Sequence, residues 1–417
     1  MADEIINRRR FRRIAGAGAA FQGATAAVDS ATVVASLVYQ LTGSVFAVGA
    51  ASAVLRLGWL LPQMVVGYLA ERAERRMPFY VFGAFGRATC AGLIVLLLWF
   101  GAALPAPLLA AGFLILWSLY AFVSGVVAVP YNDIVGRSIA SDRRSRMLAW
   151  RFFGGGLVAL LVAGFIRWSL AALPGLQAYA LIFALAALLM LLSSALFVSA
   201  GEPHLVRPAT APPRQRKTPK EFLRGGWDVL RDDARFRLFL HSQWLGGATL
   251  MALPFYMVAA LQRGITPADV GLLLGMQTAG ALGSNFFWGR LGDRAGKLIL
   301  LRIVALVRII PPLGILILLA TGAGLAGFAV LFVLIGAMMN GVTIGYLGYL
   351  MEISPDDRRP AYSAYFNALA SPAALTPLLG AALVALVSIN AVFVAAIAAA
   401  IWQVVLLRRI SRLQTDK

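Results

Sequence analysis

Long apolar runs alternate with short polar loops along most of the chain. A helix needs about 20 apolar residues to cross a bilayer core of about 30 Å. With this length as a guide, the pattern predicts twelve helical segments. They span residues 14–39, 45–70, 78–100, 106–131, 147–168, 176–199, 238–261, 267–290, 298–320, 325–351, 361–386 and 390–407. The pattern therefore predicts an all-α membrane protein with twelve transmembrane helices.

The composition agrees with this interpretation. Hydrophobic residues make up 60% of the chain and charged residues 13%, whereas a soluble domain is about half apolar and about a quarter charged. The sequence contains no catalytic triad, phosphate-binding loop or dinucleotide fingerprint. Its one cysteine and two histidines show no metal-ligand spacing. We therefore expect neither an enzyme nor a cofactor or metal site. The run Gly154–Gly156 lies in an apolar pattern and predicts close helix packing.

The net charge of +19 would suit a nucleic-acid partner, but the distribution of the charge argues against one. Of the 37 Lys and Arg residues, five lie deep inside the segments, and only Arg167, at the end of a segment, and Arg263, in a loop, lie on one side. All the others lie on the opposite side. Cytoplasmic loops carry such an excess of basic residues, so we expect both termini to be cytoplasmic.

Residues 200–237 differ from the rest of the chain because they are rich in proline and basic residues. This composition predicts a cytoplasmic linker between two six-helix bundles, 1–199 and 238–417. Within the linker region, four residues indicate an amphipathic helix along the membrane surface: Trp227, Leu230, Phe236 and Phe239.

Two loops share a pattern that indicates internal duplication. The loop after the second segment contains Gly67, Leu69, Glu71, Arg72 and Arg75. The loop after the eighth segment has the same residue types at the same spacing: Gly289, Leu291, Asp293, Arg294 and Lys297. A second pair, Asp142-Arg143 and Asp357-Arg358, precedes the fifth segment of each half. Matching positions in both halves are typical of transporters built from repeats.

The second of these loops, including Gly296, resembles the Gly-x-Leu-x-Asp-Arg-x-Gly-Lys signature of the major facilitator superfamily (MFS). The first loop is a degenerate copy, with Glu71 in place of Asp and Glu74 where Gly is expected. The resemblance implies two pseudo-symmetric six-helix bundles, the MFS fold. It also implies a membrane transporter, which we expect to be a monomer whose partners are a small-molecule solute, protons and membrane lipids, with no nucleic acid.

By resemblance, the charges of the two loops form a cytoplasmic gate made of Glu71, Arg72, Asp293, Arg294 and Lys297. We expect Gly67 and Gly289 to permit close helix approach. The acids would accept hydrogen bonds from a neighbouring helix N-terminus. Two further acids, Asp133 and Glu352, would act as gate charges near Arg143 and Arg358. The alternative is that all of these are ordinary loop charges, placed on the cytoplasmic side as the positive-inside rule describes.

Charges at mid-depth are costly and therefore point to function. Asp29 is the one acid near the centre of the predicted bilayer, and Arg56 lies at a similar depth on the next segment. Asp29 would bind a proton or substrate, and Arg56 would bind an anionic group. The alternative is a static ion pair between the two. For Arg87 and Arg308, which occupy matching places, we expect a structural role.

The resemblance places the first, fourth, seventh and tenth segments around the cavity. Additional candidate substrate contacts on these segments and on the eighth are Tyr131, Asn340, Gln243, Trp244 and Gln277. Polar contacts between helices are the alternative explanation for each of them.

We therefore expect a proton-coupled symporter of a small organic solute in a bacterial-type inner membrane, working by alternating access. The excess of mid-membrane arginine over acid favours an organic anion. The alternatives are an exporter of drugs or amphiphiles, a lipid or lysolipid flippase, and a membrane sensor or assembly protein that transports nothing. The antiporter elements of the superfamily, an Arg in the fourth segment and Gly-Pro-x-x-Gly-Gly in the fifth, are missing.

Overall fold

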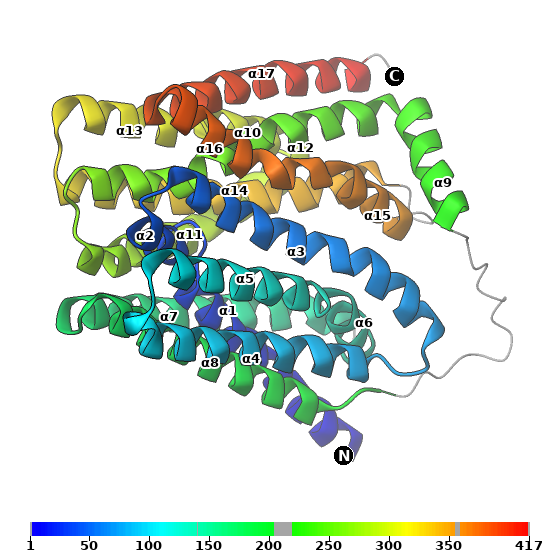
Figure 1. The fold of residues 1–417 in the computed structure, drawn as a ribbon. Helices are drawn as coiled ribbons and strands as arrows, with labels where there is room; N and C mark the ends of the chain where they lie inside the picture. The colour runs from blue at the N-terminus through cyan, green and yellow to red at the C-terminus, as the bar shows by residue number, and fades with distance from the viewer. Residues whose placement is uncertain (1, 140, 204–218, 355–358, 416–417) are drawn as a thin grey trace, which may run out of the picture. The chain divides into compact units, whose positions relative to one another are not determined.

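The computed structural model describes residues 2–139, 141–203, 219–354 and 359–415, and within them it is all-helical (Figure 1). The first helices are α1 (Ala2–Ala27), α2 (Val33–Thr42), α3 (Val45–Arg72), α4 (Met77–Phe100), α5 (Ala106–Gly125), α6 (Ala128–Ser138), α7 (Ser141–Ala172) and α8 (Gly175–Ala200). They are followed by α9 (Pro219–Asp232), α10 (Ala234–Gln262), α11 (Val270–Arg294), α12 (Lys297–Val307), α13 (Ile310–Thr321), α14 (Leu325–Ile353), α15 (Arg359–Ala370), α16 (Thr376–Leu386) and α17 (Ile389–Thr415). Three short 3₁₀ helices are η1 (Gly101–Ala103), η2 (Pro267–Asp269) and η3 (Ser371–Leu375).

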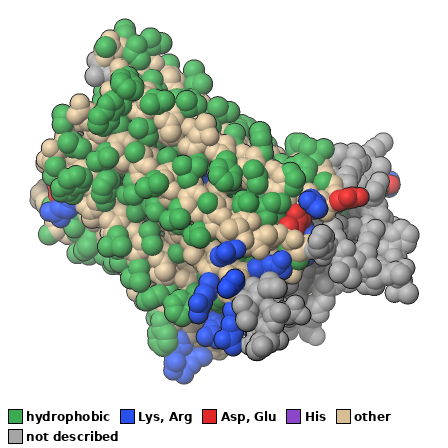
Figure 2. Space-filling view, turned by 90° about the horizontal axis from the view of Figure 1, so that it is seen from below, with side chains coloured by type: hydrophobic (Ala, Val, Ile, Leu, Met, Phe, Trp, Pro, Cys, Tyr) green, Lys and Arg blue, Asp and Glu red, His purple; other side chains and the backbone are tan. Residues whose placement is uncertain are grey.

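Ten helical stretches within the described residues are long and apolar enough to cross a membrane. Two of the twelve predicted segments are not among them. The segment 14–39 is divided between α1 and α2, and the segment 267–290 forms α11 but is more polar. Large apolar side chains point outward, for example Leu161 and Leu386, which are 75% and 84% exposed. The face drawn in Figure 2 is largely hydrophobic, with Lys and Arg gathered toward one end. These features describe a multi-pass membrane protein.

The chain forms two compact units. The first contains Met1–Leu205 together with Pro254–Ala279, and the second contains Val206–Leu253 together with Gly280–Lys417. The units are therefore not continuous in sequence, because a hairpin made from the end of α10, η2 and the start of α11 groups with the first. The predicted domain boundaries at 199/200 and 237/238 remain predictions.

Within the first unit, α1 packs against α7 and α8, and α4 packs against α5 and α8. Small residues permit the α1–α7 contact, because a Cβ atom at Gly155 would lie 2.0 Å from Oε1 of Gln22. Similarly, a Cβ atom at Gly23 would lie 2.3 Å from a methyl group of Val158. The helix-packing role predicted for Gly154–Gly156 is thus confirmed at Gly155.

The structure describes no close helix approach at Gly67 or Gly289, and the role expected of these two glycines remains a prediction. A Cβ atom at either position would meet no described heavy atom within 4 Å. The close approaches lie about two and a half helical turns earlier in the same helices, at Gly58 of α3 and Gly280 of α11. A Cβ atom at Gly58 would lie 2.6 Å from Cβ of Ala121 in α5, and one at Gly280 would lie 2.0 Å from the carbonyl oxygen of Val333 in α14. The same sequence interval separates Gly58 from Gly280 as Gly67 from Gly289.

In the second unit, α12 packs against α14 and α17 around an aromatic core. Phe236 and Phe239 are fully buried in this core and belong to α10. Assigning these two residues to a surface helix was therefore wrong, because the separate helix α9 ends at Asp232 and Phe236 and Phe239 lie within α10. Helix α9 begins earlier. It packs Gly226 against the ring of Tyr365 and leaves Trp227 65% exposed.

Candidate functional site

Asp29 lies at a break between α1 and α2, where residues 28–32 are not helical. Its Oδ1 atom accepts hydrogen bonds from the backbone N–H of Ala31 (3.1 Å) and Thr32 (2.9 Å) and from the Thr32 hydroxyl (2.8 Å). Short polar side chains that bond to nearby backbone groups compete with helix formation. The carboxylate therefore stabilises the break and satisfies backbone donors at the start of α2.

The second carboxylate oxygen, Oδ2, has no hydrogen-bond partner among the described residues. Arg56 of α3 lies within electrostatic range of Asp29, but no nitrogen–oxygen distance between them is within 4.0 Å in the described structure. The Nε atom of Arg56 is buried and donates to no described group. The two predicted residues are therefore neighbours without direct contact, so a tight static ion pair is not what the structure contains.

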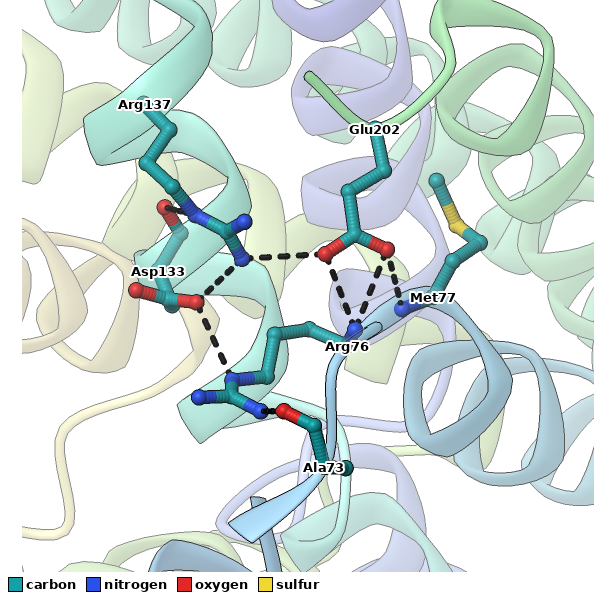
Figure 3. Close-up of polar contacts among 6 residues, drawn as sticks. All are labelled: Ala73, Arg76, Met77, Asp133, Arg137 and Glu202. Carbon is teal, nitrogen blue, oxygen red and sulfur yellow. Dashed lines mark hydrogen bonds and ion pairs between the residues drawn. The ribbon is translucent and has the colours of Figure 1, made fainter. Parts of the chain in front are cut away.

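A second group of charges lies where α4 begins and where α6 and α8 end, which we call the basic end (Figure 3). Glu202 follows α8 and accepts hydrogen bonds from the backbone N–H groups of Arg76 (2.9 and 3.0 Å) and Met77 (2.9 Å). These groups are the free donors at the start of α4, where the helix dipole also favours an anion. Gly201 has φ of +74°, a conformation that favours glycine, and it turns the chain so that Glu202 reaches α4.

The basic end is completed by Asp133 and Arg137 of α6. Arg137 donates to both Asp133 and Glu202, and its Nη2 atom lies 3.0 Å from Oε1 of Glu202. Arg76 Nε lies 3.3 Å from Oδ2 of Asp133, and the same guanidinium donates to the carbonyl of Ala73. The expected neighbour of Asp133 was Arg143. The structure instead pairs it with Arg137, one turn along the same helix, and with Arg76.

The Glu202 carboxyl is only 10% exposed. Burial raises its pKa, but the N–H donors of Arg76 and Met77 and the charge of Arg137 lower the pKa further, so the net pKa lies below the ordinary value. Glu202 is therefore an anion at neutral pH that joins the end of α8, the start of α4 and the end of α6.

In the second unit, Asp293 accepts no hydrogen bond from the backbone N–H groups at the start of α12 in the described structure. It accepts from Nζ of Lys297 at 3.2 Å, one turn further along the chain. Gly296 has φ of +87°, a backbone conformation that favours glycine, which explains why the signature has glycine at this position. Arg294 and Glu352 are exposed. The side chains of Glu71 and Arg72, as well as the whole of Arg358, lie outside the described residues, so the gate predicted from them remains untested.

Two polar candidates tie helices together. Asn340 of α14 donates to Oδ1 of Asn285 (2.8 Å) and to the carbonyl of Ala281 (3.1 Å) in α11. Trp244 of α10 donates to the carbonyl of Leu369 in α15 at 2.9 Å. These contacts show helix-to-helix bonds at both positions. Gln243 and Gln277 are half-buried, and their proposed substrate contacts remain predictions.

Further polar groups inside the bundles include Tyr131, Arg151 and the matching arginines Arg87 and Arg308. The Tyr131 hydroxyl accepts from Nη1 of Arg151 at 2.9 Å. Arg308 donates to Oε1 of Gln403 at 2.5 Å and so ties α12 to α17. The guanidinium carbon of Arg87 lies 4.2 Å from the ring centroid of Phe21. Of the two matching arginines, Arg308 has a described hydrogen bond between helices and Arg87 does not.

Sequence reasoning missed three residues of the basic end: Arg76, Arg137 and Glu202. Arg76 was included only as a loop charge, and Glu202 was assigned to the linker. A signal was available, because Gly201-Glu202 directly follows an apolar run, and Asp133 and Arg137 have the spacing of an ion pair on one helix face. The described residues contain no group of three or more metal-binding side chains.

Three solved structures share the fold over nearly the whole chain. The auto-inhibited POT family peptide transporter has a TM-score of 0.70 at 12% identity, with 98% of this chain and 97% of that chain covered. A bacterial homologue of the iron transporter ferroportin, in its inward-facing state, has a TM-score of 0.69 at 12% identity, with 97% and 98% covered. The nucleoside transporter NupG has a TM-score of 0.64 at 14% identity, with 98% of each chain covered.

No curated protein matches the chain. The family model of the Major Facilitator Superfamily matches residues 15–371 and again 248–416. Together with the repeated loop signature and the helical bundles, this match shows that the chain belongs to the Major Facilitator Superfamily.

Proposed function

We propose that the protein is a proton-coupled symporter that carries a small organic anion across the inner membrane by alternating access. Membership of the superfamily supports secondary transport. The basic end would face the cytoplasm, because basic residues gather on the cytoplasmic side of membrane proteins. The observation that carries the proposal is the break in the first helix at Asp29.

Discontinuous helices in transporters mark binding sites for substrate and coupling ions, where unwound backbone lines a cavity. At this break, Asp29 uses one carboxylate oxygen for three hydrogen bonds and leaves Oδ2 available. Protonation of Oδ2 would remove the negative charge near Arg56 without breaking the bonds that hold the turn. Arg56 would then attract a substrate anion more strongly, which couples proton binding to anion binding.

The hairpin Pro254–Ala279 supports alternating access. At the end of the first unit opposite to the basic end, α11 packs closely on α7, because a Cβ atom at Gly271 would lie 2.3 Å from the backbone nitrogen of Arg167. Gln262 also donates to the Tyr39 hydroxyl at 3.2 Å. Opening of the transporter on this side requires these contacts to separate. These contacts are made by close packing at glycine positions and by few hydrogen bonds in the described structure.

The test is uptake by the purified protein in proteoliposomes under an inward proton gradient. The radiolabelled probes are lactate, citrate and glycerol 3-phosphate as anions, glucose as a neutral solute and tetraphenylphosphonium as a cation. We expect uptake of at least one anion, stimulated by the gradient. Asp29→Asn should abolish the stimulation while leaving anion exchange at equal pH, because its amide can still hold the turn but cannot bind a proton.

The matched control is Asp228→Asn, which removes the same charge from an exposed position on α9. It should transport like the wild type. Wild-type uptake confined to tetraphenylphosphonium would contradict the proposal in favour of an exporter. An unchanged gradient response in Asp29→Asn would contradict the role of Asp29.

A further inference from the structure

Two arginines inside the first unit, Arg87 of α4 and Arg151 of α7, lack an acidic partner among the described residues. Arg87 is only 3% exposed, and its guanidinium makes a cation–π contact with the face of Phe21. No hydrogen bond from Arg87 to a described residue is present. The Nε atoms of both arginines are buried and donate to no described group. Each guanidinium therefore retains unused hydrogen-bond donors inside the bundle.

Arg151 is held in place by its surroundings. Its Nη1 atom donates to the Tyr131 hydroxyl, and its guanidinium carbon lies 5.1 Å from the Tyr131 ring centroid and 5.7 Å from that of Phe152. Its stem lies over Gly18 of α1, where a Cβ atom would come within 2.5 Å of Cγ. The absence of a side chain at Gly18 thus leaves the room that Arg151 occupies.

The two guanidinium groups lie within electrostatic range of each other. The other titratable neighbours of Arg87 are the hydroxyls of Tyr80 and Tyr120. Among the described acids of the first unit, Asp29 lies near Arg56, and Asp133 is paired with Arg76 and Arg137. Glu202 is likewise paired with Arg137. The two positive charges therefore have no counter-charge among the described residues, and burial of unpaired charges is strongly unfavourable.

The second unit provides a comparison inside the same chain. Arg308 occupies the place that matches Arg87, but its guanidinium donates to Gln403, whose amide donates in turn to the carbonyl and hydroxyl of Ser242. The Nε atom of Arg308 is also buried without a described acceptor, but its Nη1 atom has an acceptor supplied by the protein. No described residue accepts a hydrogen bond from Arg87, so an anion from outside the chain can supply the acceptor.

We propose that Arg87 and Arg151, with Tyr131 holding Arg151 in position, bind the anionic head group of the transported solute. Guanidinium groups match carboxylate and phosphate oxygens in pairs of hydrogen bonds, which gives them an advantage over lysine at such sites. This site rests on the proposed function, which identifies the bound anion as the transported solute. It adds a site on α4 and α7 to the one at Asp29 and Arg56.

The experiment is equilibrium binding to the full-length protein in detergent by isothermal titration. The probes are lactate, citrate and inorganic phosphate, a short-chain phosphatidic acid as a lipid source of phosphate, and glucose as a neutral control. We expect a soluble organic anion to bind. Arg151→Lys should weaken that binding about tenfold or more, because lysine keeps the charge but loses the paired hydrogen bonds. Arg87→Lys should do the same.

Two further variants make the result interpretable. Tyr131→Phe keeps the ring and removes the acceptor for Arg151, and it should weaken binding even if an arginine variant does not fold. Arg308→Lys is the matched control, because it makes the same change at the matching arginine that has its own acceptor. It should bind the anion like the wild type.

The site is overturned if no anion binds, or if the folded variants of Arg87, Arg151 and Tyr131 all bind like the wild type. Binding of phosphatidic acid alone would overturn the assignment to the solute. Loss of binding in Arg56→Gln but not in Arg151→Lys would remove this site and leave the proposed function intact. Loss in Arg151→Lys, combined with no uptake in proteoliposomes, would keep the site and remove the proposed function.

Discussion

Glu202 shows how one side chain can join three segments at the basic end. Its carboxylate accepts from two backbone N–H groups at the start of α4 and from Arg137 of α6. A carboxylate that caps a helix start contributes about 1 kcal/mol, and bonds to charged groups contribute more. This contact depends on a charge, so it depends on pH.

The corresponding prediction is that Glu202→Gln lowers the unfolding temperature in detergent at pH 7. The folded-state pKa of Glu202 lies below its ordinary value of 4.5. The stabilisation is therefore complete above that value and is lost as the pH falls through the lower folded-state pKa. The difference from the wild type should shrink below about pH 4. Glu74→Gln, an exposed acid in the preceding loop, should change little. A difference that is equal at pH 7 and pH 3.5 would contradict this role.

Single residues also show what the sequence could predict about the site. Asp29 could be selected because an acid at mid-depth is costly. Its position at a helix break could have been inferred from Asp29 and Thr32, which precede an apolar run as an N-terminal cap does. The lack of an acid near Arg87 and Arg151 could not be predicted, because it depends on which helices pack against α4 and α7.

At the scale of helices, the repeat is expressed in packing as well as in loop sequence. Gly58 brings α3 onto α5, and Gly280 of α11 lies against the Val333 carbonyl of α14. No described atom of another helix lies close to Gly67 or Gly289, and glycine spacing alone does not tell which turn of a helix meets its neighbour. Glycines of the same repeat can therefore have different roles, one set by packing and one by the adjoining loop.

This difference predicts opposite effects of two equivalent substitutions. Gly280→Ala would place a Cβ atom 2.0 Å from the Val333 carbonyl and should destabilise the fold by about 1–3 kcal/mol. Gly289→Ala meets no described atom within 4 Å and should be neutral or gain up to about 1 kcal/mol of helix propensity. Unfolding temperatures in detergent compare the two. Equal losses at both positions would show that the α11–α14 contact does not depend on Gly280.

At the scale of the whole molecule, apolar run length was enough to predict a multi-pass, all-helical protein, and the transporter fold followed from the resemblance of the repeated loops. It could not predict that the first segment divides at Asp29, because a break of five residues leaves the apolar pattern intact. It also could not predict that Pro254–Ala279 groups with the first unit. Such a grouping depends on long-range contacts, which a local pattern does not contain.

The hairpin contact gives the most direct test of alternating access. A Cβ atom at Gly275 would lie 3.4 Å from Cβ of Ala163, close to the spacing of about 3.5–4.5 Å in disulfides. Cysteines at both positions, in a Cys90→Ala background that removes the chain's one natural cysteine, should therefore form a disulfide on oxidation.

The measurement is uptake of the transported anion by this double-cysteine variant in proteoliposomes, before oxidation, after oxidation and after reduction. The account predicts uptake by the reduced protein, no uptake once the disulfide holds the hairpin on α7, and recovery when the disulfide is reduced. Equal uptake by the oxidised and reduced protein, with the disulfide verified by mass spectrometry, would contradict transport by separation of the hairpin from α7.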